Sequence, residues 1–144
     1  LINEINKDYE RENIKLNMEV DKSFEDLNFT ITRKPEIVHS LSNVIENAYQ
    51  HTKSEVTIKM SLSGENIIFE IIDNGNGFPA DILPILGEPY VKKNEIDHSG
   101  MGLGLFIAKN LINKSLGKIE FINLVNKGAC VRISWKKDNL ILSQ

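Results

Sequence analysis

The chain has little of several residue types that mark specialised folds. It contains one cysteine, four prolines and one tryptophan among 144 residues. Cys130 alone cannot form an internal disulfide, and no Cys/His cluster has the spacing of zinc ligands. No window approaches the roughly 18 to 20 uninterrupted apolar residues of a membrane span, and the N-terminus lacks a signal-peptide pattern. These absences exclude a disulfide scaffold, a zinc module and a membrane segment, and they predict a cytoplasmic domain.

Long runs of like charge are also missing. The 17 basic and 20 acidic residues give a formal net charge of −3, and they are interspersed along the chain. A nucleic-acid tail or a polybasic membrane patch is therefore excluded, so neither nucleic acid nor direct membrane contact is expected. The length and the 41% apolar content suit one globular domain with a single core. Because the chain begins at Leu1 without an initiator Met, we expect it to be excised from a longer protein.

The hydrophobic pattern predicts both strands and helices. Alternating apolar residues predict strands, and apolar spacings of three and four predict helices. The strands are expected at 14–20, 27–31, 55–63, 66–73, 118–124 and 129–135, and the helices at 35–51, 79–86 and 100–115. The predicted fold class is α+β: a two-layer α/β sandwich whose mixed, mainly antiparallel sheet packs on about three helices. Residues 1–11 are expected to be a linker or the end of an upstream helix, 12–137 the domain, and 138–144 a C-terminal tail.

A pair of asparagines lies within the first long helix. Asn43 and Asn47 are four residues apart, so their side chains project from one face, and neither fits the apolar stripe. Asn disfavours helix relative to better formers, which suggests a use beyond local propensity. Its neutral oxygen suits Mg²⁺, which usually completes its shell with water and substrate phosphates. Two exposed Asn on a solvated face remain the alternative.

A second candidate site follows the apolar strand at 66–73. A carboxylate at the strand end, Asp73, can accept a hydrogen bond from an adenine amino group. The glycines at Gly75 and Gly77 permit positive φ and a close approach of the backbone to a ligand. An ordinary Asn-Gly turn is the alternative.

A glycine-rich segment opens the last long helix. Gly100, Gly102 and Gly104 alternate with Met101, Leu103 and Leu105, and they free backbone N–H groups to meet phosphate oxygens at a helix N-terminus. It is not a Walker loop, because no Gly-Lys-Ser/Thr follows, and no strand precedes it as in a dinucleotide fingerprint.

The segment 87–99 before this helix is long and polar. It contains Tyr90, Lys92, Lys93 and His98, and its lysines are suited to neutralise a triphosphate while its glycine-flanked ends let it close over a ligand. A solvated loop without function is the alternative.

The order of these four features is more specific than any one of them. An Asn pair on a helix, a strand ending in Asp-x-Gly-x-Gly, a polar lid and a Gly-x-Gly-Leu-Gly-Leu helix start together resemble the Bergerat ATP-binding fold of gyrase, Hsp90, histidine kinases and MutL. Residues 43–48 resemble the histidine-kinase N box with its two Asn. Gyrase and MutL, by contrast, would have Glu at the position of Asn43. Segments 33–37, 86–91 and 103–109 are similar to the RegB/PrrB/ActS group of redox-responsive sensor kinases.

The resemblance implies a function and a role for each site residue. The chain would be the catalytic domain of a two-component sensor histidine kinase, passing the γ-phosphate of ATP to a histidine elsewhere. Catalytic roles fall on Asn43, Glu46 and Asn47, with Asn47 as the Mg²⁺ ligand and Glu46 orienting the water shell of the metal. ATP contacts are implied for Asn43, Asn47, Gln50, His51, Asp73, Gly75, Gly77, Tyr90, Lys92, Lys93 and the run from Gly100 to Leu105.

The chain also departs from the family pattern. Gln50 and His51 stand where many members have Lys and Tyr, Tyr90 where Phe is common, and Gly128-Ala129 where Gly-Thr is usual. Neither His39, His51 nor His98 is followed by an acidic residue as the phosphorylated histidine of the family is.

The expected partners are therefore a histidine-bearing dimerisation domain of the same parent, which would be an inner-membrane sensor, and a response regulator. The alternatives are a non-catalytic nucleotide-binding module and a serine-kinase anti-sigma factor of the same fold. Cys130 on the last strand is expected to be a small buried core residue and not a redox sensor.

Overall fold

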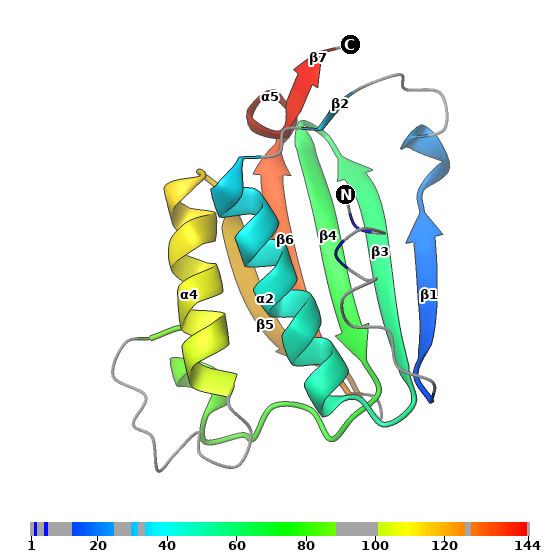
Figure 1. Ribbon diagram of the computed structural model, residues 1–144, viewed down its shortest axis with the longest axis vertical. Helices are drawn as coiled ribbons and strands as arrows, with labels where there is room; N and C mark the ends of the chain where they lie inside the picture. Colours follow the sequence, from blue (N-terminus) through cyan, green and yellow to red (C-terminus); the bar gives the residue numbers. More distant parts are fainter. Residues whose placement is uncertain are drawn as a thin grey trace.

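The fold is a sheet covered on one face by two long helices (Figure 1). The structure is a computed structural model that describes residues 2, 5, 13–24, 30–31, 34–88, 101–125 and 128–143. The sheet has the strand order β1-β3-β4-β6-β5. Its strands are β1 (Lys15–Val20), β3 (Glu55–Ser63), β4 (Asn66–Asp73), β5 (Lys118–Asn123) and β6 (Ala129–Lys136). Among the described strands, only β1 and β3 pair in parallel, so the predicted mixed, mainly antiparallel sheet is confirmed.

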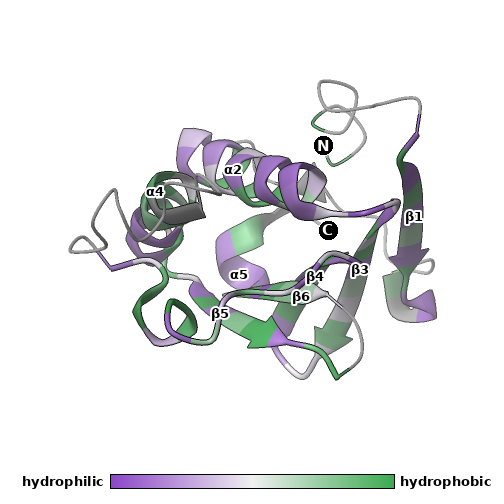
Figure 2. Ribbon diagram, turned by 90° about the horizontal axis from the view of Figure 1, so that it is seen from below, coloured by the Kyte–Doolittle hydropathy of each residue, from purple (hydrophilic) through white to green (hydrophobic). Residues whose placement is uncertain are grey.

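The two long helices follow the predicted bounds closely. Helix α2 spans Pro35–His51 and α4 spans Met101–Lys114, and they lie side by side and antiparallel on the same face of the sheet (Figures 1 and 2). Pro35 occupies the first turn of α2, where its missing N–H would have no partner within the helix. Within the described ranges, no helix combines the length and the apolar character that crossing a bilayer requires.

The core lies between the helices and the sheet. Its largest fully buried side chains include Trp135, Phe69, Leu41, Ile45 and Ile112. Burying each such side chain contributes about 1.5 to 3 kcal/mol, so this layer contact is the main stabilising feature of the fold. Ile2 and Ile5 are also buried in this core, with exposed fractions of 8% and 5%. Part of the N-terminal segment therefore packs on the domain.

Three short elements were not predicted, and one was predicted differently. The segment expected to be a helix at 79–86 forms only a 3₁₀ turn, η2 (Leu83–Ile85). Pro84 lies inside this segment and cannot donate a helical hydrogen bond, which explains the difference. A 3₁₀ turn η1 (Lys22–Phe24) follows β1, and α5 (Lys137–Leu140) follows β6. Strand β7 (Ile141–Ser143) pairs with β2 (Thr30–Ile31) in a separate two-stranded sheet.

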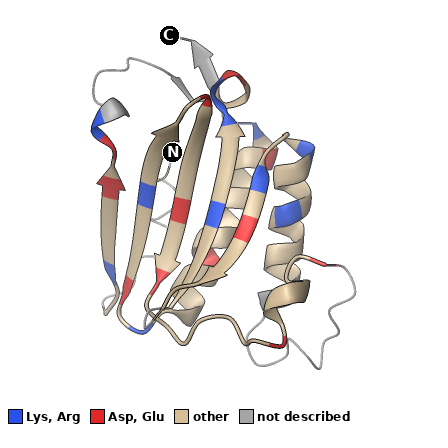
Figure 3. Cartoon of the chain, turned by 180° about the vertical axis from the view of Figure 1, so that it is seen from behind, with Lys and Arg blue, Asp and Glu red and all other residues tan. Residues whose placement is uncertain are grey.

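The face of the sheet without helices carries a row of alternating charges (Figure 3). The register places Glu19 beside Lys59, Lys59 beside Glu70, Glu70 beside Arg132 and Arg132 beside Glu120. The row thus crosses all five strands with a change of sign at each step. Opposite charges on neighbouring strands contribute about 0.2 to 1 kcal/mol per pair. The same alternation leaves this face suited to water.

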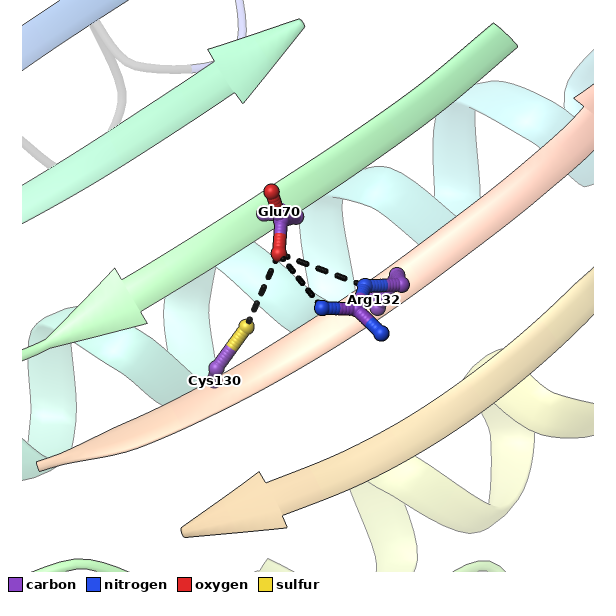
Figure 4. A network of polar contacts seen from close by, with 3 residues as sticks. All are labelled: Glu70, Cys130 and Arg132. Carbon is purple, nitrogen blue, oxygen red and sulfur yellow. Dashed lines mark hydrogen bonds and ion pairs between the residues drawn. The ribbon is translucent and has the colours of Figure 1, made fainter. Parts of the chain in front are cut away.

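Cys130 belongs to this charged face and not to the helix-covered core. Its side chain points from β6 toward Glu70, which also accepts hydrogen bonds from Arg132 at 3.2 and 3.0 Å (Figure 4). Cys130 is fully buried, as predicted, but the expected place in the core is wrong, because it lies outside the main core cluster on the face that Arg132 shares. Burial, with the nearby Glu70 charge, raises the pKa of the thiol to about 11. The thiol is therefore neutral at physiological pH and poorly reactive.

Candidate functional site

Three separate segments meet at one end of the helix layer. The C-terminal half of α2, the end of β4 and the N-terminus of α4 all lie at the lower end of the molecule in Figure 1. Because α2 and α4 run antiparallel, the second half of one helix is next to the beginning of the other. The two Asn, the Asp-x-Gly-x-Gly turn and the glycine-rich helix start are therefore brought to the same region.

The asparagine pair does not lie on a fully solvated face. Asn47 is only 7% exposed, and Asn43 and Glu46 are half-buried. The backbone oxygen of Asn47 is 2.8 Å from Nδ1 of His51, one helical turn later. This contact fixes His51, which is half-buried, at the end of α2, whereas Gln50 points to solvent. The alternative of two freely exposed Asn is wrong for Asn47.

Asp73 presents a buried carboxylate at the end of β4. Its exposed fraction is 4%. Its Oδ1 accepts hydrogen bonds from the backbone N–H groups of Gly75 at 2.8 Å and Ala129 at 3.4 Å. Burial raises the pKa of this carboxyl, and the two N–H groups and the His51 charge oppose the rise. Among the described residues, both hydrogen bonds to this carboxylate end on Oδ1, so Oδ2 is available as an acceptor.

Two residues that pack closely against Asp73 have to be glycine. A Cβ on Gly75 would overlap the backbone oxygen of His51, and one on Gly128 would overlap the backbone and carboxylate of Asp73. These overlaps involve backbone atoms, which cannot move aside as the end of a flexible side chain can. Gly77 has φ +81°, the left-handed region that favours glycine. The turn after β4 is thus built for close backbone packing.

Two asparagines that the sequence did not single out as site residues hold this turn from either side. Oδ1 of Asn74 lies 2.8 Å from Oγ1 of Thr52 and 3.0 Å from the backbone N of Ser54, so Asn74 closes the turn between α2 and β3. Asn123, at the end of β5, accepts from the N–H of Phe78 and donates to its oxygen. No short-range signal identifies such contacts, because Asn123 and Phe78 are 45 residues apart.

The glycine-rich segment begins α4 as predicted, but only part of it is described. Met101 and Gly102 begin the helix, and a Cβ added at Gly104 would meet open space. Leu105 is fully buried in the core, whereas the side chain of Leu103 is 65% exposed. The first turn of a 14-residue helix presents backbone N–H groups without helical partners, which is a favourable place for phosphates. Gly100 and the lid residues Tyr90, Lys92, Lys93 and His98 lie outside the described residues.

The residues present fit a nucleotide better than a metal held by protein alone. Among the described residues, no group of three or more His, Cys, Asp or Glu side chains is placed to hold a metal ion. Asn47 offers one neutral amide oxygen, so a Mg²⁺ ion here would depend on phosphate oxygens and water for most of its ligands. The buried Asp73 carboxylate and the α4 N-terminus match the base and the phosphates of a nucleotide at opposite ends of the site.

A groove of about 510 Å³ lies elsewhere, on the open face of the sheet. Its lining includes Glu19, Glu55, Lys59 and Glu70, together with Asp73 and Asn74 at one end. No residue of α2 or α4 contributes to it. Its carboxylates would repel phosphates, so this groove does not suit a nucleotide.

Comparison with known proteins decides the family. A family model described as histidine kinase-, DNA gyrase B-, and HSP90-like ATPase matches residues 32–139. The chain belongs to this family. The sensor histidine kinase RegB of Cereibacter sphaeroides is 34% identical over 131 residues, which cover 78% of this chain and 28% of the relative. The resemblance to RegB-type kinases is therefore confirmed, and the chain spans little more than a quarter of that protein.

Solved structures support the same fold. The catalytic domain of the histidine kinase ThkA has a TM-score of 0.73 and 23% identity, covering 94% of this chain and 90% of that one. The full-length kinase ShkA, solved in complex with AMPPNP, has a TM-score of 0.67 and 22% identity, covering 89% of this chain and 26% of that one. Family, relatives and fold agree on an ATP-binding catalytic domain of the sensor-histidine-kinase type.

Proposed function

We propose that this domain binds ATP with Mg²⁺ and transfers the γ-phosphate to a histidine on a separate dimerisation domain, for relay to a response regulator. The observation that carries the proposal is the Asp73 carboxylate, 4% exposed and pressed between Gly75 and Gly128 at the end where α2 and α4 meet. A buried charge of this kind is costly for folding, so it points to a function. The match to sensor kinases supports the same reading.

The base and the phosphates would be held by different parts of the site. Asp73 would accept the adenine amino N–H through Oδ2, because Oδ1 already accepts from two backbone N–H groups. The free N–H groups at the start of α4 would face the phosphates. Asn43 and Asn47, on the neighbouring helix, would bind the phosphate and metal end of the nucleotide. Mg²⁺, when bound, would neutralise phosphate charge.

Transfer would then depend mainly on positioning. Phosphoryl transfer needs the attacking and leaving groups in line and the developing charge stabilised, and little covalent chemistry is asked of the protein. The three histidines of this chain do not supply an acceptor motif. His51 contacts the backbone of Asn47, and His39 is an exposed residue of α2. A histidine from another domain would therefore have to approach the α4 end of the site.

An exposed apolar pair on α4 is a suitable docking place for that domain. Leu103 and Ile107 are 65% and 39% exposed and one helical turn apart, close to the phosphate-binding end of the helix. Ile107→Ser should slow transfer to a supplied acceptor domain without weakening ATP binding. Leu116, 72% exposed just beyond the opposite end of α4, offers a matched control as Leu116→Asn. Equal slowing by both variants would argue against this docking place.

Calorimetric titration with ATP, with and without Mg²⁺, tests binding, and incubation with labelled ATP and an acceptor domain tests transfer. We expect Mg²⁺-dependent binding and acid-labile label on the acceptor alone. Binding without transfer to a cognate acceptor would favour a non-catalytic nucleotide module. Acid-stable label on a protein serine would favour an anti-sigma kinase instead. Acid-labile label on the chain itself would contradict the view that the acceptor lies outside it.

A further inference from the structure

The last residue of β5 reaches across to the turn that follows β4. Oδ1 of Asn123 accepts a hydrogen bond from the N–H of Phe78 at 2.7 Å, and its Nδ2 donates to the oxygen of Phe78 at 2.9 Å. A backbone N–H can only donate and a backbone oxygen can only accept, so these partners fix the orientation of the amide. One side chain therefore clamps both polar atoms of a single residue.

Two further contacts hold the same turn on β5. Gly77 lies so close to this amide that an added Cβ would be 2.8 Å from Oδ1 of Asn123. The Phe78 ring is 3% exposed and meets the Phe121 ring edge to face, with 5.9 Å between centroids. Phe121 precedes Asn123 by two residues on β5. Strand β5 thus fixes the far end of the turn through both a polar and an aromatic contact.

The near end of this turn is bonded to Asp73. The N–H of Gly75 donates to Oδ1 of Asp73 at 2.8 Å, and two residues separate Gly75 from the clamped Phe78. A shift of the turn would therefore move a donor that orients the carboxylate. We propose that Asn123 is a positioning residue for the nucleotide site, acting on the adenine end through the turn at 74–78. This inference rests on the proposed function, because it assumes that Asp73 binds the base.

The test compares the 144-residue chain with its Asn123→Ala variant. Loss of two side-chain hydrogen bonds should free the turn to move. The affinity for both ATP and ADP, measured by calorimetry, should then fall by about fivefold or more. The factor should be the same for both nucleotides, since the phosphate end is untouched. Ser115→Ala is the matched control. It removes the hydrogen bond from Nε1 of Trp135 at the opposite end of α4 and should leave both affinities unchanged.

A double variant separates positioning from general destabilisation. If Asn123 acts through Asp73, then Asn123→Ala should cost much less affinity in an Asp73→Asn background than in the wild-type chain. Additive losses, or an equal loss in the Ser115→Ala control, would overturn the positioning role. Wild-type affinity in Asn123→Ala would overturn it as well. Failure of the wild-type chain to bind ATP would defeat the proposed function first, and the inference would fall with it.

Discussion

Replacement of Asp73 by Asn separates binding of the nucleotide from folding of the domain. The substitution keeps the size of the side chain and keeps Oδ1 as an acceptor for Gly75 and Ala129. It replaces the charged Oδ2 by an amino group that cannot accept from adenine. Losing a hydrogen bond to a charged acceptor costs about 1.5 to 3 kcal/mol, so ATP and ADP should bind about 10- to 150-fold more weakly.

The effect on stability should be small and should depend on pH. Burial raises the pKa of Asp73 above its ordinary value in the folded chain. The folded state therefore binds this proton more tightly than the unfolded state does. The stability that this proton provides is fully present below the pKa of Asp73 in the unfolded chain. It is lost as the pH rises through the higher pKa of Asp73 in the folded chain. Compared with the wild type, Asp73→Asn should thus be relatively more stable at pH 7 than at pH 3.

Calorimetry for affinity and thermal melting at the two pH values provide the measurements. Asp81→Asn is the matched control, because Asp81 is exposed in the turn before η2 and should change neither property. Unchanged nucleotide affinity in Asp73→Asn would refute the adenine assignment. A large drop in melting temperature at pH 7 would instead mean that the carboxylate is needed for folding, and the reasoning from its buried charge would be wrong.

Three more predictions follow from single features. Asn47→Asp should fold yet transfer phosphate more slowly to an acceptor supplied in trans, because a new charge alters the balance between metal and triphosphate; equal rates would remove Asn47 from the metal site. Cys130, whose pKa is about 11, should resist thiol reagents at pH 8 until the chain unfolds. Its neutral thiol contributes stability below about pH 9 that is lost as pH rises to 11, and Cys130→Ala should lack this loss. Ile5→Ala should lower the free energy of unfolding by about 2 kcal/mol in denaturant titration, whereas Val125→Ala, at a site 86% exposed, should not.

The elements that the sequence predicted well are those that combine an apolar pattern with a residue that marks their start or end. Helix α2 has both the spacing of its apolar face and Pro35 at its start, and its observed bounds are those predicted. Strand β3 alternates apolar with polar residues, and β4 is a nearly continuous apolar run, and a turn at Gly64 separates the two. The pairing of β2 with β7 had no such signal, because it joins two very short strands from opposite ends of the chain.

The same distinction applies to the site. Asn43, Asn47 and Asp73 stand out locally, since a polar residue interrupts an apolar pattern in each case. Gly128 and Asn123 resemble ordinary turn and strand-end residues, and only their contacts across the fold give them a role. Gly128 packs on Asp73, which is 55 positions earlier in the printed sequence, and no periodicity connects the two. Contacts of this kind require the structure.

The two faces of the sheet differ in a way that favours the helix face for the proposed nucleotide. On the open face, Glu19, Glu70 and Glu120 alternate with Lys59 and Arg132, so each cation already has anionic neighbours and the acidic groups outnumber the basic ones. A triphosphate bound there would be repelled by the carboxylates, and no unpaired cation of this row would offset that repulsion. On the helix face, the only carboxylate in the buried layer of the described residues is Asp73. In the proposed binding mode it would accept from the adenine, and the α4 N-terminus would attract the phosphates.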